Sequence, residues 1–79
     1  MSHGYSMSLV YANKKADIKN PGVALGRFCI DNNIPVVQVS EGLGVSRMTV
    51  YNWFSGSFVP SEGHTAAIKR FIGRHKNRK

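Results

Sequence analysis

Apolar and polar residues recur at helical spacing in two short runs within residues 34–56. The apolar and small residues of the first run fall at i, i+3, i+4 and i+7, on one face of a helix over about residues 35–43: Val36, Val39, Ser40 and Leu43. The second run, residues 46–55, has an apolar face that carries Val50, Trp53 and Phe54. Its other face carries Arg47, Met48, Tyr51, Asn52 and Ser55. The pattern therefore predicts two short helices, each of which buries one face.

Residues between and beside these runs favour a tight turn. Gly44 stands between them, and glycine adopts the left-handed backbone conformation at low cost. Pro35 suits the first turn of the first helix, and Ser46 is a favoured cap for the second. Val45 is expected to contribute to the core, and Gly56 to end the second helix.

Two further helices are predicted around this pair. One covers about residues 21–32, with an inner face of Leu25, Phe28 and Cys29. The other covers about residues 61–73, with an inner face of Ala67, Ile68, Phe71 and Ile72. Ile34 is expected to pack ahead of the first short helix, and Phe58 and Val59 to fold back over the core from a loop at residues 57–60.

Residues 1–20 show no helical periodicity. Residues 8–12 fit either a short strand or an anchored tail, and the stretch that follows is basic, with Lys14 and Lys15. We therefore expect an N-terminal arm over residues 1–20, a helical domain over 21–73 and a basic tail over 74–79. The arm either contacts nucleic acid or is simply a solvated terminus.

Charge and cysteine content narrow the class of partner. The chain has 79 residues, enough for one small domain, and its net charge is +7. This excess favours an anionic partner, with nucleic acid ahead of an anionic membrane surface. The single Cys29 excludes an internal disulfide and fits a reducing, cytoplasmic compartment. No apolar run is long enough for a transmembrane helix.

Residues 21–72 resemble the helix-turn-helix proteins of the Cro and lambda-repressor-like class. The resemblance rests on six spaced positions: the small Ser40, the apolar Leu43, Gly44 in the turn, the apolar Val45, and Val50 and Trp53 in the second helix. It implies an all-α, compact four- to five-helix domain with flexible basic termini. It also implies a DNA-binding transcription regulator, a small repressor of the kind found in phages, and a homodimer is a common assembly in this class.

In that class the second helix of the motif enters the major groove of duplex DNA. Arg47 suits guanine, Asn52 suits adenine or a phosphate, and Met48 suits a thymine methyl group. Tyr51 suits a base or a phosphate. The remaining candidate DNA contacts are Ser46, Thr49, Gln38, Lys14 and Lys15, and for Ser46 the role of helix cap is favoured over a DNA contact.

Three alternatives carry different weight. A protein-interaction module that binds polymerase or another host factor is favoured by the apolar start of the first short helix, at Val36 and Val37. Charge-driven coating of DNA is weaker. Catalysis is disfavoured, because the four carboxylates and three histidines form no recognisable catalytic or metal-binding set. We expect no cofactor, and no effector pocket in so small a core.

Overall fold

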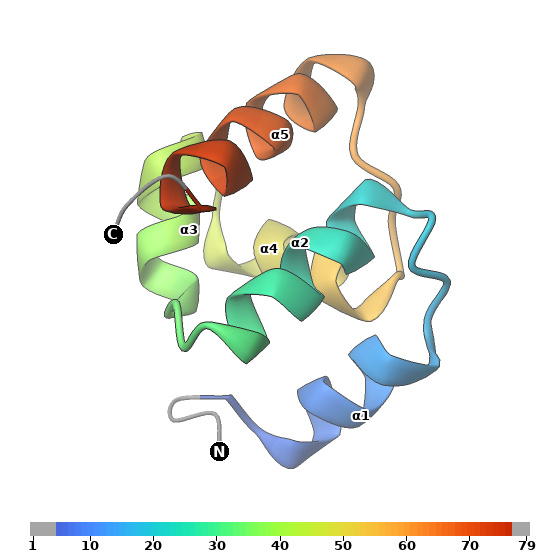
Figure 1. Ribbon diagram of the computed structural model, residues 1–79. Coiled ribbons are helices and arrows are strands. Elements are labelled where there is room, and N and C mark those ends of the chain that lie inside the picture. The colour runs from blue at the N-terminus through green and yellow to red at the C-terminus, as the bar shows by residue number, and fades with distance from the viewer. Residues whose placement is uncertain (1–4, 77–79) are drawn as a thin grey trace.

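Helices form all the regular secondary structure in residues 5–76, the part of the chain that the computed structural model describes. The five helices are α1 (Met7–Lys15), α2 (Pro21–Asp31), α3 (Val36–Leu43), α4 (Arg47–Ser55) and α5 (Glu62–Lys76). The pair α2–α4 occupies the centre, and α1 and α5 lie on opposite sides of it (Figure 1). The predicted small all-α domain is therefore confirmed.

The predicted helix ends around the central turn are largely confirmed. Gly44 and Gly56 both adopt the left-handed conformation, with φ of 68° and 83°. The Ser46 hydroxyl accepts a hydrogen bond from the Thr49 amide at 3.1 Å, and so caps α4. Pro35 lies one position earlier than expected: it is the residue before α3 rather than part of its first turn.

The core is built on a close crossing of α2 and α4. A Cβ atom added at Gly22 would lie 2.7 Å from the Cβ of Trp53, and one at Gly26 would lie 2.8 Å from Cγ of Phe54. Both positions therefore require glycine for the backbones to approach so closely. Most of the predicted inner residues of α2, α3 and α4 are fully buried, among them Leu25, Cys29, Val39, Val50 and Phe54. The predicted inner residues Phe28 and Leu43 are partly buried and pack against this core.

The expectation of a strand or flexible arm over residues 1–20 is wrong where the structure describes the chain. Residues 7–15 form α1, which Ser6 caps by accepting a hydrogen bond from the Leu9 amide at 3.1 Å. The helix escaped prediction because its one fully buried position is polar, Asn13, and the apolar residues that α1 packs against the core, Leu9 and Val10, are partly buried and too few to mark a helical face. Residues 1–4 lie outside the described part of the chain.

Asn13 joins α1 to two other helices. Its Nδ2 atom donates to the carbonyl oxygens of Val23 in α2, at 3.1 Å, and Phe54 in α4, at 2.7 Å. Its Oδ1 atom accepts from Nε of Arg27 at 2.9 Å, and Nη2 of Arg27 donates to the Asn13 carbonyl at 3.0 Å. The Phe54 carbonyl belongs to the last turn of α4, where no helical amide can reach it, so Asn13 satisfies a group that would otherwise be unpaired.

Tyr5, two residues before α1, also ties the N-terminal part of the chain to the core. Its ring stacks on Phe54, with centroids 6.1 Å apart, and its hydroxyl donates to the carbonyl of Ile34 ahead of α3. Burial, with smaller effects from Cys29 and Tyr51, raises the pKa of Tyr5 well above its usual range. The Tyr5 hydroxyl thus remains a neutral hydrogen-bond donor.

Two expectations for the second half of the chain are also corrected. Phe58 and Val59 point outward, with 61% and 70% of their surface exposed, and Pro60 is buried in their place. The cause is the tight return after α4, where the amides of residues 57 and 58 both donate to the Asn52 carbonyl. The last helix runs to Lys76 rather than ending at Gly73, so only residues 77–79 of the predicted tail 74–79 remain, outside the described part.

Asn13→Ala is expected to lower the free energy of unfolding by about 2–4 kcal/mol, because it leaves two carbonyl oxygens and the Nε–H group of Arg27 without their side-chain partner. Urea denaturation followed by circular dichroism measures this difference. Lys14→Ala, at the next, exposed position of the same helix, is the matched control and should cost about 0.5 kcal/mol or less. Equal losses in the two variants would show that the Asn13 network does not hold α1 in place.

Candidate nucleic-acid interface

The helix pair α3–α4 places one face of α4 outward. Behind the turn, the Val45 amide donates to the Ser40 carbonyl at 3.0 Å, and the small, buried Ser40 donates from its hydroxyl to the Val37 carbonyl at 3.0 Å. Val50, Trp53 and Phe54 bury the inner face of α4, as predicted. The outer face is left open to solvent because its neighbours all lie behind it.

The outer face of α4 carries most of the residues predicted for DNA contact. Arg47, Met48 and Tyr51 are exposed, with 67% of Met48 and 42% of Tyr51 accessible. Asn52 and Thr49 are half-buried at the edges of this face. Neither the Arg47 guanidinium nor the Asn52 side-chain amide is bonded to another residue within the described range 5–76. Both are therefore available to an external partner.

Ser46 and Thr49 are less available. The Ser46 hydroxyl caps α4 and also lies 3.0 Å from the Thr49 hydroxyl, so the two side chains are bonded to each other. The predicted capping role of Ser46 is confirmed, and it competes with any contact to DNA.

Trp53 is only 4% exposed and packs against the His64 ring, with centroids 5.2 Å apart. It belongs to the core, as predicted, which leaves Tyr51 as the exposed aromatic residue of α4.

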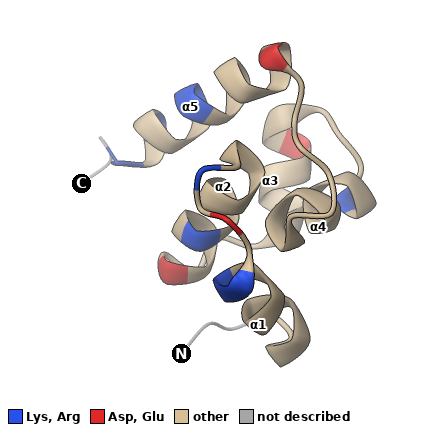
Figure 2. Ribbon diagram, turned by 90° about the vertical axis from the view of Figure 1, so that its right-hand side faces the viewer, with Lys and Arg blue, Asp and Glu red and all other residues tan. Residues whose placement is uncertain are grey.

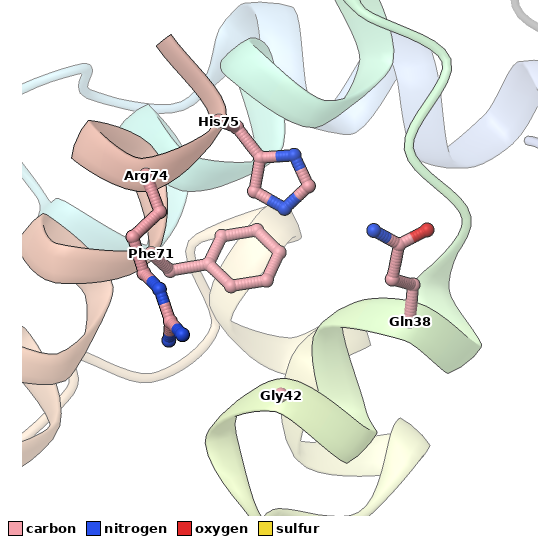
Figure 3. A pocket seen from close by; sticks show the side chains of 5 residues that line it. All are labelled: Gln38, Gly42, Phe71, Arg74 and His75. Atoms are coloured by element: carbon pink, nitrogen blue, oxygen red, sulfur yellow. The ribbon is translucent and has the colours of Figure 1, made fainter. Parts of the chain in front are cut away.

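The other predicted contacts are not brought to this face. Gln38 is exposed on α3 but lines a cleft shared with the end of α5 (Figure 3). Lys14 and Lys15 lie in the last turn of α1, which Asn13 anchors to the C-terminal end of α4, whereas Arg47 begins α4. The Lys15 ammonium lies 5.0 Å from the centroid of the Tyr11 ring.

Positive charge is spread unevenly over the helices. Within residues 5–76, α4 carries one cation, Arg47, and α3 carries none, whereas α1 ends in two lysines. The densest group is on α5: Lys69, Arg70, Arg74 and Lys76. Figure 2 shows blue segments on α1 and α5 as well as α4. The side chains suited to reading bases and most of the charge suited to binding phosphates thus lie on different elements.

Sequence reasoning missed two groups that define the surroundings of α4. Phe58 and Val59 extend the exposed apolar surface just beyond Gly56, and Asn13 fixes the C-terminal end of the helix from behind. A hydrophobic loop is usually expected to fold inward, and a lone asparagine is usually expected outside. Only the tertiary contacts show that Phe58 and Val59 are exposed here and that Asn13 is buried.

Cys29 is fully buried, as predicted for a small hydrophobic residue. Burial raises the pKa of its thiol to about 12. No group of three or more His, Cys, Asp or Glu side chains within residues 5–76 is arranged to hold a metal ion. Over the same residues, no helix is long and apolar enough to cross a membrane.

Comparison of the chain with protein-family models, with curated proteins and with solved structures gave no match.

The Cys29 thiol is expected to resist Ellman's reagent in the folded protein at about pH 8, because it is buried and remains protonated well above that pH. In denaturant it should react completely within the normal time for a free thiol. Absorbance at the thionitrobenzoate band, with and without denaturant, measures the difference. Rapid reaction of the folded protein would contradict the burial of Cys29.

Proposed function

We propose that this chain is a sequence-specific, double-stranded DNA-binding transcription regulator that inserts helix 46–55 into the major groove. The observation that carries the proposal is the two-sidedness of α4. Its inner face is buried against the core, while Arg47, Met48 and Tyr51 project into solvent from its outer face. A helix supported in this way, with no element covering its outer face in residues 5–76, can enter a groove that admits one helix.

Each outward side chain offers a different contact. The Arg47 guanidinium can donate two hydrogen bonds to O6 and N7 of guanine, and the Asn52 amide can pair with N6 and N7 of adenine. Met48 offers an apolar surface to a thymine methyl group, and Tyr51 can contact a base or a phosphate. Arg47 and Met48 lie in the first turn of α4, the end that reaches deepest in this docking mode.

Phosphate contacts would come from the flanking elements. Lys14 and Lys15 on α1, Gln38 on α3 and the cations of α5 surround the central pair, and such contacts add affinity without sequence preference. A homodimer that reads two half-sites about 34 Å apart would multiply a modest affinity. The regulator would act in the cytoplasm as a repressor of the kind found in phages, by occluding a site that polymerase or another regulator needs.

A protein-interaction module that binds polymerase or another host factor is the second candidate. Four exposed apolar side chains favour it: Val37 on α3, Met48 on α4, and Phe58 and Val59 after α4. The single cation of α4 also fits a protein partner better than it fits strong phosphate binding. Exposed aromatic and methionine side chains are enriched in protein interfaces.

Selection of bound duplexes from a random pool, at near-physiological salt, tests the proposal, because salt weakens phosphate-only binding. A consensus is expected. Arg47→Ala should lower the affinity for the selected duplex by about 1–3 kcal/mol and relax the preference at one position, because it removes a paired contact to one base. Fluorescence anisotropy with selected and scrambled duplexes measures both effects.

Arg70→Ala on α5 is the matched control, since it removes the same charge from an exposed position away from α4. This variant should lower the affinity for selected and scrambled duplexes by the same factor. If Arg47→Ala and Asn52→Ala together leave the selected duplex as tightly bound as before, α4 does not read DNA. Failure to recover any duplex would favour the protein-interaction module.

A further inference from the structure

A cleft separates the α3 helix from the C-terminal half of α5, although the size of the core gave no reason to expect one. It has a volume of about 310 Å³ and is lined by Gln38, Gly42, Phe71, Arg74 and His75. Figure 3 shows the rings of Phe71 and His75 reaching from α5 toward the Gln38 amide on α3, with Gly42 below. His75 also borders a smaller hollow of about 200 Å³ beside the loop that precedes α3.

Two rings form an aromatic wall on the α5 side of the cleft: Phe71, which is a core residue with 8% of its surface exposed, and the half-buried His75. The ring centroids of Phe71 and His75 lie 4.4 Å apart, at an interplanar angle of 43°. Opposite them, Gly42 has no side chain, and a Cβ there would lie 3.1 Å from Cε1 of Phe71. The absence of that side chain lets α3 approach the ring closely and leaves the cleft bordered by ring surface and backbone. A flat apolar group can pack against such a wall.

Two polar side chains at the cleft have no partner in the described part of the chain. The Arg74 guanidinium forms no hydrogen bond or ion pair with another residue of the range 5–76, and neither does the Gln38 amide. A guanidinium donates paired, charge-assisted hydrogen bonds to a carboxylate, and an amide can donate a further one. The Arg74 guanidinium therefore favours a planar anion as the ligand of the cleft.

We propose that this cleft binds a small aromatic carboxylate. The carboxylate pairs with Arg74, while the ring lies against Phe71 and His75 and faces the Gln38 amide across the cleft. The volume is near the lower limit for small-molecule sites, which fits a ligand of about one ring. Inorganic phosphate or a DNA phosphate would satisfy Arg74 but leave the aromatic wall unused. None of the cleft residues lies on α4, so the proposal does not depend on base reading by that helix. Gln38 and Arg74 do belong to the elements proposed to contact phosphates, so the cleft is tested in the absence of DNA.

Titration of the ¹⁵N-labelled full chain with benzoate, without DNA, tests the proposal. We expect saturable shifts of the backbone amides at Gln38, Gly42, Phe71, Arg74 and His75, with the remainder of the spectrum unchanged. Benzamide has the same shape without the charge and should bind about tenfold more weakly or worse, because it cannot form the charge-assisted pair. Inorganic phosphate, which lacks the ring, should also bind more weakly than benzoate.

Arg74→Gln removes the charge from the cleft and should weaken the binding of benzoate by about tenfold, as expected for benzamide with the parent chain. Arg70→Gln, on the same helix but not at the cleft, is the matched control and should bind benzoate as the parent chain does. Both positions are exposed, so a spectrum with unchanged dispersion will verify that each variant folds. The proposal is overturned if benzoate gives no localised saturable shifts, if benzamide or phosphate binds equally well, or if Arg74→Gln binds benzoate normally.

Discussion

The side chain of Asn13 is the interaction on which the arrangement of the helices depends. It is a fully buried amide whose donors and acceptor are all engaged, by two carbonyl oxygens and one guanidinium that belong to two other helices, α2 and α4. A polar group in that position is costly unless each of its bonds is made, so it admits one geometry of α1 against α2 and α4. Gly26 leaves the room for it, since a Cβ there would lie 2.6 Å from the Asn13 Nδ2 atom. The core beneath α4 is therefore specified by a hydrogen-bonded network as well as by apolar packing.

Sequence pattern predicted the parts of the fold that follow from local rules. The helices from α2 to α5 have apolar inner faces at helical spacing, and Ser46, Gly44 and Gly56 adopt the cap and turn conformations that their chemistry favours. The α1 helix could not be predicted in this way, because its buried residue is Asn13 and its nearest aromatic anchor, Tyr5, precedes the helix. The cleft between α3 and α5 could not be predicted either, because it joins residues of two helices that are far apart in the sequence, such as Gln38 and His75.

The candidate site, too, could be predicted from the sequence only in part. Which residues of α4 face outward was predictable from spacing, since Val50 and Trp53 fix the inner face and leave Arg47, Met48 and Tyr51 opposite. The other elements that share this surface could not be predicted from spacing. Gln38 faces α5, and the lysines of α1 flank the C-terminal end of α4, away from Arg47. In the proposed regulator, sequence preference would then come from short-range contacts of one helix. Affinity would come largely from charge on α5 and α1, and would fall as salt rises.

Amide chemical-shift mapping of the full chain with a duplex, at near-physiological salt, tests most directly whether α4 is the reading helix. The account predicts that the largest shifts fall in residues 46–52, with smaller, salt-sensitive shifts on α5. Shifts confined to α5 and the end of α1, with α4 unchanged, would contradict it and would identify the binding as charge alone. The measurement is decisive because the two sets of residues lie on different helices.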